Sequence, residues 1–445
     1  MSDPSLPVPA AERVTLLDAV RGFALCGVFV SNSVMWFSGR VLLPRERFKD
    51  LTAPPIESSV MALYDFFVNQ KFVTLFAFLF GLGFSIQLTR AQARGVSLVP
   101  LYSRRLLVLL GMGLTHLFAI WVGDILATYA VVGFALLFFR HRSDRTVLLW
   151  VLALMVGVPL LVSALQYFGP RWLWGVQAAL EAAQARTALD NAAKARFLEG
   201  LLADSPWTTQ VANARHGVYM LPQVKRLMWM SLILGRFLLG LLAGRYLLLQ
   251  EVERHRAWHR RLLVWGLVLG VPGNIVGLVI QRLRIMGVVD PAKSDWMFLV
   301  PTLQEVGHLG LAAAYLAAFA LLFQRERWRA GMRLLAPVGR MALSLYLMQS
   351  LVSLWLYDGW GLGLVGQTPP SRSVAMALGI FALQIPLSHV WLSRFRFGPA
   401  EWVWRSLTYG RAQPMRLTLA RPLDPGLLQN QKEGGAQEPS PRLRR

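Results

Sequence analysis

An apolar stretch close to the amino terminus carries two opposite charges in its first turns. Residues 16–37 read LLDAVRGFALCGVFVSNSVMWF, long enough to cross a bilayer, since a membrane helix needs about 20 apolar residues. Asp18 and Arg21 are three residues apart, so they share one helix face and can form an ion pair. Asn32, three turns beyond Arg21, falls on that face too. Ionisable groups inside a membrane cost about 2.5–3.5 kcal/mol each on insertion scales and usually face a protein interior or a wet cavity. The stretch therefore predicts a membrane helix that borders a polar site.

The same apolar character extends along the whole chain. Of its 445 residues, 55% are hydrophobic and 16% are charged, with a mean hydropathy of +0.45, whereas a soluble domain carries about 25% charge. We therefore predict an all-α fold, a polytopic integral membrane helix bundle with about ten transmembrane helices. The further apolar runs cover residues 72–88, 106–122, 125–139, 146–168, 228–249, 262–283, 296–323, 334–357 and 374–395.

The loops between these runs alternate in arginine content, which predicts the orientation. Arginine-rich segments are found at 90–105, 140–145, 254–261 and 325–333, and the segments 123–124, 286–295 and 358–371 between them are poor in Lys and Arg. The first outer loop departs from the pattern because it holds Arg40, Arg45, Arg47 and Lys49. We expect a multi-pass protein of the cell membrane with both termini cytoplasmic.

The net charge of +22 raises the question of a nucleic-acid partner. The charge is spread over the predicted inner loops, where it orients the protein and meets anionic lipid head groups. There is no basic stripe interleaved with aromatic residues, as single-strand binding requires, so we expect no nucleic-acid partner. The one cysteine, Cys26, excludes a disulfide within the chain and a Cys-based metal site.

Composition divides the chain into four parts. Residues 1–169 form an N-terminal membrane bundle, 170–226 an extracytoplasmic helical loop, 227–421 a C-terminal membrane bundle, and 422–445 a disordered tail. The loop is Ala-rich and has apolar residues every four positions at Leu189, Ala193, Phe197 and Leu201, the pattern of an amphipathic helix. The segment FGPAEWVWRSLTYG predicts an interfacial helix after the last run. The tail is rich in Pro, Gly and Gln and charged. No internal repeat is visible.

A histidine in the third run has a possible carboxylate partner. His116 lies in the outer half of this run, and Asp124 follows eight residues later at a tight turn. Reorientation at the turn would bring the carboxylate to the imidazole, and a neutral His with a carboxylate partner is the usual form of a general base. The alternative is a buried His that bonds a backbone carbonyl on a neighbouring helix.

Three further runs contain polar side chains. In the eighth run, Glu305 and His308 share a face with Gln304 and Tyr315. Their E-x-x-H spacing is typical of di-iron bundles, but no second motif accompanies it, so we favour the wall of a substrate cavity and expect no metal. In the ninth run Arg340 marks the inner end. Lys71 immediately precedes the second run at its outer end, and its side chain alternatively snorkels to the interface. The remaining polar residues of the ninth run follow one face and alternatively hold helices together: Tyr346, Gln349, Ser350 and Ser353.

Recognised motifs of soluble enzymes are missing. The sequence has no P-loop or Rossmann fingerprint, no G-x-S-x-G elbow and no H-E-x-x-H pair. Composition and spacing thus do not name a substrate.

Four blocks carry a family resemblance: RVTLLDAVRGFALCGVFVSN, KFVTLFAFLFGLGF, RRLLVLLGMGLTHLFAIWVGDILATYA, and GRMALSLYLMQS followed by FGPAEWVWRSLTYG. Over nearly its full length the chain resembles YeiB-like membrane proteins, whose C-terminal half is domain of unknown function 418. The first half also resembles transmembrane acyltransferases of the heparan-alpha-glucosaminide acetyltransferase kind, which share an L-D-x-x-R-G opening, here Leu17, Asp18, Arg21 and Gly22. That resemblance implies a membrane His, matched here by His116, that passes an acyl group from cytosolic acyl-CoA to an acceptor.

We therefore hypothesise an acyltransferase acting across the membrane, with acyl-CoA as co-substrate and a small-molecule or lipid-linked acceptor. Its partners are then membrane lipid and that acceptor. A transporter or flippase of a small polar or lipid-linked molecule, and a scaffold without chemistry, are the alternatives. The catalytic candidates are His116, Asp124, Glu305 and His308. The acyl-CoA site would be formed by Asp18, Arg21 and Arg340, with the two arginines holding the phosphates because guanidinium groups bind phosphate through paired donors. The acceptor would be lined by Asn32, Lys71, Tyr346 and Gln349.

Overall fold

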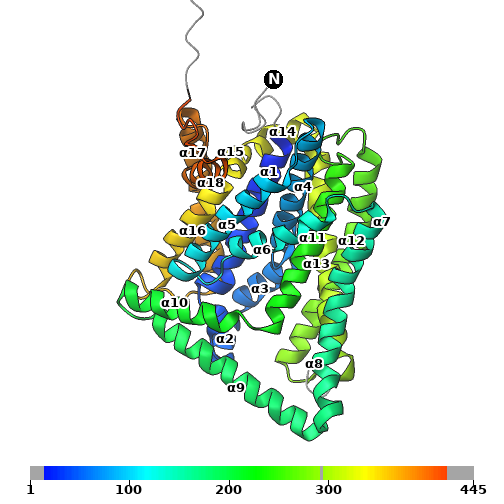
Figure 1. Cartoon of the computed structure of the whole chain (residues 1–445). Helices are drawn as coiled ribbons and strands as arrows, with labels where there is room; N and C mark the ends of the chain where they lie inside the picture. Colours follow the sequence, from blue (N-terminus) through cyan, green and yellow to red (C-terminus); the bar gives the residue numbers. More distant parts are fainter. Residues whose placement is uncertain (1–14, 291–293, 418–445) are drawn as a thin grey trace, which may run out of the picture.

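The computed structural model describes residues 15–290 and 294–417. This part is helical, and its only β feature is an isolated bridge between Phe395 and Arg416. The long helices run side by side, and α9 crosses obliquely beneath them (Figure 1). Following the predicted orientation, we call the end that carries α14, α15 and α18 the inner end and the opposite end the outer end. The structure confirms the predicted all-α membrane bundle.

The described residues contain seven helices that are long and apolar enough to cross a membrane. Helix α5 is more polar because it carries two arginines and a histidine, and two other apolar helices, Leu126–Phe139 and Ala342–Tyr357, are shorter. Each of the ten predicted runs coincides with one of these ten helices, although the number that spans the membrane stays a prediction. The seven are Thr15–Leu42, Pro55–Ala93, Asp144–Trp174, Val224–Arg245, Arg256–Arg284, Asp295–Phe323 and Pro370–Arg394.

The helices have the following bounds. The first half contains α1 (Thr15–Asn32), α2 (Arg45–Thr52), α3 (Pro55–Phe67), α4 (Lys71–Ala93), α5 (Val99–Ala119), α6 (Leu126–Leu136), α7 (Asp144–Leu152), α8 (Val158–Trp174), α9 (Val176–Leu201) and α10 (Pro206–Met220). The second half contains α11 (Val224–Arg245), α12 (Arg256–Ile285), α13 (Val300–Phe323), α14 (Glu326–Arg333), α15 (Ala336–Arg340), α16 (Ala342–Tyr357), α17 (Pro370–Arg394) and α18 (Pro399–Tyr409).

Glycines allow the closest helix contacts. A Cβ at Gly81 of α4 would collide with the backbone of Phe237 on α11, and one at Gly240 of α11 with the backbone of Phe78 on α4. Helices α12 and α13 meet in the same way through Gly266, Gly270, Gly273, Gly307 and Gly310. Small residues at such positions let membrane helices approach, since lipid supplies no hydrophobic force between them.

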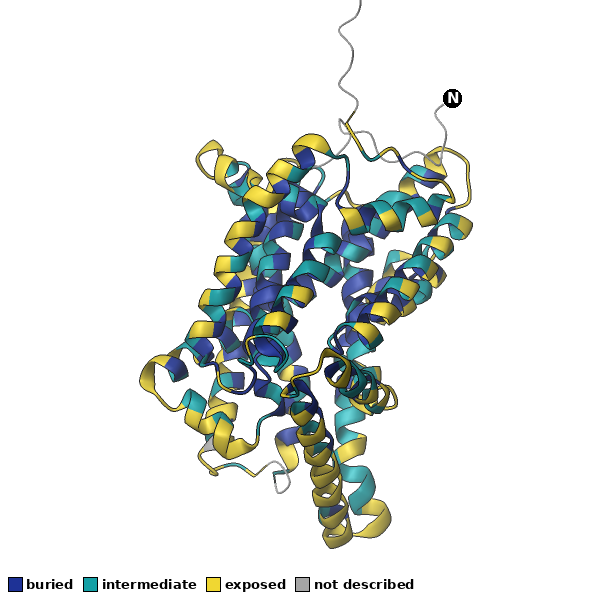
Figure 2. Ribbon diagram, turned by 90° about the vertical axis from the view of Figure 1, so that its left-hand side faces the viewer, coloured by how far each residue is buried: buried dark blue, intermediate teal, exposed yellow. Residues whose placement is uncertain are grey.

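Exposure separates the interior of the bundle from its outer surface. Buried residues gather inside the bundle, and exposed residues lie on the outer helices and on the hairpin below (Figure 2). On α8 and α12, exposed side chains are large and apolar, among them Leu165, Trp172, Trp265 and Val268. Such faces suit contact with lipid, which solvates apolar side chains.

Helices α9 and α10 form a hairpin across the outer end (Figure 1). Ala193, Phe197 and Leu201 of the predicted stripe are buried, but Leu189 is 68% exposed, because α9 extends beyond the bundle there. The predicted disordered tail, 422–445, lies outside the described residues.

Candidate functional site

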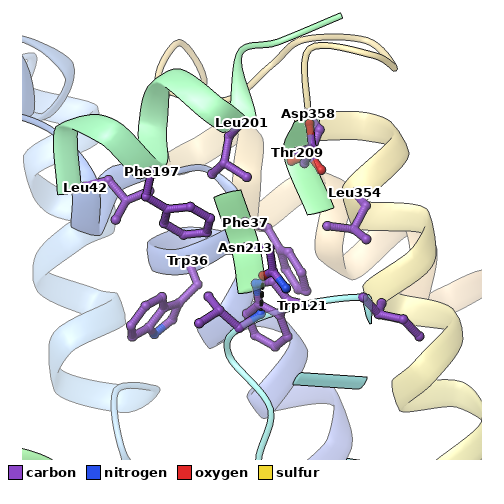
Figure 3. A pocket seen from close by; sticks show the side chains of 12 residues that line it. Trp36, Phe37, Leu42, Trp121, Phe197, Leu201, Thr209, Asn213, Leu354 and Asp358 are labelled. Carbon is purple, nitrogen blue, oxygen red and sulfur yellow. Dashed lines mark hydrogen bonds between the residues drawn. The ribbon is translucent and has the colours of Figure 1, made fainter. Parts of the chain in front are cut away.

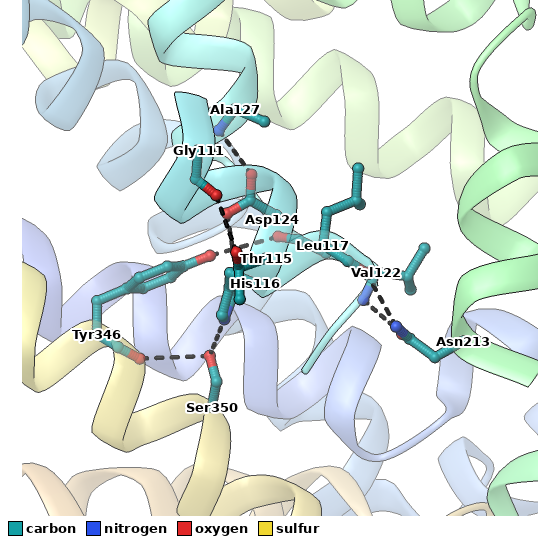
Figure 4. Close-up of polar contacts among 11 residues, drawn as sticks. Gly111, Thr115, His116, Leu117, Val122, Asp124, Ala127, Asn213, Tyr346 and Ser350 are labelled. Atoms are coloured by element: carbon teal, nitrogen blue, oxygen red, sulfur yellow. Dashed lines mark hydrogen bonds and ion pairs between the residues drawn. The ribbon is translucent and has the colours of Figure 1, made fainter. Parts of the chain in front are cut away.

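Three buried polar side chains form a chain of hydrogen bonds at the outer end of the bundle (Figure 4). His116 lies in the last turn of α5, Asp124 in the loop before α6, and Ser350 on α16. The His116 Nδ1 is 2.9 Å from Asp124 Oδ1, and the His116 Nε2 is 3.0 Å from Ser350 Oγ. Each of the three residues is less than 7% exposed. The His116–Asp124 contact that the spacing suggested is present, and Ser350 joins it from a distant part of the chain.

Local backbone geometry sets the position of Asp124. Helix α5 ends because the backbone N–H groups of Ile120 and Trp121 both donate to the carbonyl of His116, which turns the chain back. The second carboxylate oxygen, Asp124 Oδ2, accepts a 2.7 Å hydrogen bond from Ala127 N in the first turn of α6. A carboxylate is stabilised at a helix N-terminus by its free N–H groups and its dipole. Asp124 is therefore held from both sides and fixes the imidazole.

Aromatic rings enclose this chain of polar groups. The Tyr346 ring lies 5.2 Å and the Trp121 ring 6.1 Å from the His116 ring, and Phe37 stacks on Trp121 at 4.2 Å. Tyr346 also donates a long hydrogen bond of 3.5 Å to the carbonyl of Gly123. Because the surroundings are apolar, electrostatic interactions within the site are stronger than in water.

The α9–α10 hairpin covers the outer side of the site. Asn213 of α10 accepts a 2.6 Å hydrogen bond from Val122 N and donates a 2.9 Å bond to the carbonyl of Leu117. Between hairpin and bundle is a cavity of about 20 Å³, lined by Trp36, Phe197, Leu354 and Asp358 among others (Figure 3), a space that suits a water molecule. Burial raises the pKa of Asp358 to about 7.

Cationic side chains gather at the inner end. Arg21 Nη1 is 2.7 Å from Asp18 Oδ1, so the predicted ion pair is present. Arg105 of α5 lies 3.9 Å above the Trp404 ring of α18, and its charge is close enough to interact with that of Arg21. Arg340 ends α15, which packs on α1 beside Asp18. In the sequence, Arg105 belongs to the predicted inner loop 90–105, and no spacing there marks it as a site residue.

Glu305 and His308 do not join His116, contrary to the predicted shared site. Glu305 instead binds Arg236 of α11, with Arg236 Nη2 at 2.8 and 2.9 Å from its two oxygens. His308 is within electrostatic range of Arg236 and of Lys71. No hydrogen bond or ion pair between His116 and either residue is found among the described residues. The reason is that α13 packs on α4 and α12, whereas α5 packs on α6, α10 and α18.

The predicted acceptor residues are likewise divided. Tyr346 lies beside His116, but Gln349 donates to Gln384 of α17 at 2.8 Å and joins two helices. Lys71 is fully buried, and its Nζ donates to the carbonyl of Asp65 at 2.5 Å instead of snorkelling. Asn32 ends α1. Across residues 15–290 and 294–417, no group of three or more His, Cys, Asp or Glu side chains that could hold a metal ion was found.

Similarity to other proteins places the chain in a family. Residues 243–411 match the model of a protein family of unknown function, DUF418. Uncharacterized protein YxaH of Bacillus subtilis (strain 168) is 32% identical over 421 residues, which cover 92% of this chain and 97% of YxaH. The chain belongs to the YeiB-like DUF418 family.

Two further relatives support this membership. Uncharacterized protein YeiB of Escherichia coli (strain K12) is 28% identical over 91% of this chain and 98% of its own. An uncharacterized 39.9 kDa protein of Bacillus acidopullulyticus is 26% identical over 92% of this chain and 98% of its own. No solved structure matches the chain. These names state no activity, so the resemblance to acyltransferases stays a prediction.

Proposed function

We propose that this DUF418 protein is a membrane acyltransferase that moves an acyl group from cytosolic acyl-CoA to an acceptor on the outer side, with both termini cytoplasmic. The observation that carries the proposal is the buried series Asp124–His116–Ser350, in which both imidazole nitrogens are engaged. A hydroxyl, an imidazole and a carboxylate in this order are the parts of a nucleophile activated by an oriented base, on whatever fold they occur.

The chemistry follows from the two hydrogen bonds. In the first step, Ser350 Oγ attacks the thioester carbonyl, its proton passes to His116 Nε2, the carbon–sulfur bond breaks, and the thiolate takes that proton from His116. In the second step, an acceptor hydroxyl loses its proton to His116 and attacks the acyl carbonyl, the bond between that carbonyl and Ser350 Oγ breaks, and His116 returns the proton to Ser350 Oγ. Asp124 keeps the imidazole oriented and stabilises its cationic form.

The arginines at the inner end would bind the acyl donor. Arg105 and His116 are both on α5, eleven residues or three turns apart, so they share a face about 16 Å apart along the axis. Arg21 and Arg340 lie at the same end as Arg105. Three guanidinium groups at the cytoplasmic surface suit the phosphates of coenzyme A, from which the thioester would extend along α5 to Ser350.

The hairpin controls the acceptor side. Asn213 joins α10 by hydrogen bonds to the end of α5 and to the loop that follows it. An acceptor can therefore reach His116 from the outer side only if the hairpin moves. Closure afterwards would exclude water, which otherwise hydrolyses the acyl-serine.

The test uses purified full-length protein with long- and short-chain acyl-CoA, and measures free thiol release and the mass of the intact protein. Loss of a general base typically costs about 10²–10⁴ in rate, so His116→Ala should abolish thiol release while the protein stays folded. Ser350→Ala should abolish the acyl adduct. The matched control is His389→Ala, which removes an exposed histidine on α17 and should keep wild-type activity. Full activity in His116→Ala would overturn the proposal.

One observation favours the transporter alternative. A second polar cluster, with Arg236, Glu305, His308 and Lys71, lies inside the bundle away from His116. Charged groups in a membrane interior commonly mark a substrate or ion path. A transporter would keep its flux in proteoliposomes when His116 is replaced and lose it when Glu305 is replaced.

A further inference from the structure

Two buried nitrogen atoms of Arg236 have no hydrogen-bond acceptor among the described residues. Its Nη2 makes both hydrogen bonds to Glu305, while Nε and Nη1 are buried without a partner in the described structure. The residue is 1% exposed and lies near the middle of α11. Leaving a buried donor unpaired is costly, and more so for a charged group. The two free donors therefore point to a missing acceptor.

Arg236 lines a cavity of about 310 Å³ between α4, α7, α11, α12 and α13. Its walls are mainly aliphatic, with Leu75, Leu239, Leu309 and Leu316 among the lining residues. The hydroxyl of Thr74, which also lines it, donates to the carbonyl of Gln70. Arg236 is thus the main polar feature at mid-depth, and the remaining space suits a hydrocarbon chain.

The cavity reaches the surface of the bundle near its inner end. Leu148 of α7 and Trp258 of α12 both line it and are 53% and 40% exposed. Tyr246, which follows the inner end of α11, also lines it and donates a hydrogen bond to Asp144. A chain from the surrounding membrane can therefore enter between α7 and α12 and reach Arg236.

We infer that this cavity binds a fatty acyl chain whose carbonyl oxygen accepts a hydrogen bond from one of the unpartnered guanidinium nitrogens of Arg236. Glu305 already neutralises the guanidinium charge, so a neutral ester or thioester oxygen satisfies this donor without bringing a further charge into the membrane. The chain then follows the leucines of α11 and α13 towards the inner end. This site uses other helices than the His116 site, so it does not depend on the proposed function.

The experiment compares two photoreactive probes on the purified full-length protein: methyl palmitate and an alkane of equal length. Mass spectrometry locates the labelled peptides. In the wild type, the ester should label α4, α11 and α13 more strongly than the alkane. Ala313→Phe fills the cavity without touching the ion pair and should remove this labelling. Ala375→Phe, at an exposed alanine of α17, is the matched control and should leave it unchanged.

A second variant tests the hydrogen bonds themselves. Arg236→Lys keeps a cation beside Glu305 but removes Nε and Nη1, so ester labelling should fall by about tenfold, as for the loss of a hydrogen bond to a charged group. Alkane labelling should stay the same. Equal labelling by both probes in the wild type, or undiminished labelling in Ala313→Phe, would overturn the inference.

Competition identifies the source of the chain. Unlabelled acyl-CoA and unlabelled diacyl phospholipid are added in turn to the wild type with the photoreactive ester. Displacement by acyl-CoA alone indicates a cytosolic acyl donor, and displacement by phospholipid indicates a membrane lipid. Displacement by neither contradicts an acyl-chain site.

Discussion

The ion pair of the first helix provides a simple test of how a charge in the bundle depends on its partner. Removing Asp18 leaves Arg21 without its 2.7 Å partner and within range of the like charge of Arg105. We expect Asp18→Ala to lower the yield of folded protein more than Asp18→Ala/Arg21→Ala does. The difference in free energy of unfolding between the two variants should be about 1 kcal/mol at most, because the Arg21 side chain is 32% exposed and solvent screens its charge. Size-exclusion chromatography of detergent extracts measures the yield, and equal values for both variants would contradict the pairing.

The hairpin contains a histidine that should make its stability depend on pH. Burial lowers the pKa of His216 to about 4, with a smaller contribution from Lys194, and its ring stacks on Phe197 at 4.4 Å. A histidine in the open hairpin binds its proton near pH 6.5, so the closed hairpin loses stability as pH falls from about 6.5 towards 4. The protection factors of the α9 and α10 amides, which correct hydrogen exchange for its intrinsic pH dependence, should therefore fall as pH falls over this range, and His216→Phe should flatten this fall.

Asp358 changes stability with pH in the opposite direction, so the experiment must exclude its contribution. Because its pKa is raised to about 7, the folded state holds a proton that the unfolded state has lost, and stability falls as pH rises from about 4 to 7. Measuring His216→Phe in an Asp358→Asn background isolates the histidine. An unchanged pH profile after the loss of His216 would contradict its role.

Sequence spacing anticipated the local pairs but not the distant ones. Asp18 and Arg21 are three residues apart and His116 and Asp124 eight, so helix geometry and one turn suffice to bring them together. Ser350 is 234 residues from His116, and Arg236 is 69 from Glu305. Periodicity shows which face a polar residue occupies, but the neighbour that meets this face depends on how the helices pack.

The close contact between helices α4 and α11 depends on glycine. A side chain at Gly81 has no space because the backbone of Phe237 lies directly against it. Gly81→Leu should therefore force the two helices apart and destabilise the protein by about 1–3 kcal/mol, the usual cost of overpacking. Thermal unfolding monitored by intrinsic fluorescence measures the change.

A glycine in open surroundings is the matched control. At Gly379 of α17, no atom lies within 4 Å of the position that a Cβ would occupy, so Gly379→Leu should leave the unfolding midpoint nearly unchanged or raise it. Similar midpoints for Gly81→Leu and the wild type would show that α4 and α11 do not pack as described. The glycines of the α4–α11 and α12–α13 contacts can be read from the sequence, but the helices that they contact cannot. Small residues also occur at positions that no other helix approaches.

At the scale of the whole molecule, polar groups form separate sites in one bundle. The His116 site is covered by the α9–α10 hairpin at the outer end, the arginines lie at the inner end, and the Arg236 site lies between α11 and α13. Hydropathy predicted the bundle because helices are placed mainly so that their apolar faces are buried or in contact with lipid. It did not predict the division between sites, since each helix presents polar residues to different neighbours at different depths.

The predicted orientation of the bundle decides which side of the membrane each site faces. Arginine-rich loops at one end and arginine-poor loops at the other predict a cytoplasmic inner end, and the structure separates α18 from the α9–α10 hairpin along the bundle (Figure 1). A reporter inserted at residue 200 should therefore be extracytoplasmic, and one fused after residue 430 cytoplasmic. Paired alkaline phosphatase and fluorescent reporters measure both sides. Both positions on one side of the membrane would contradict the topology, and reversal of the two would place the arginines away from cytosolic acyl-CoA and exclude the proposed donor route.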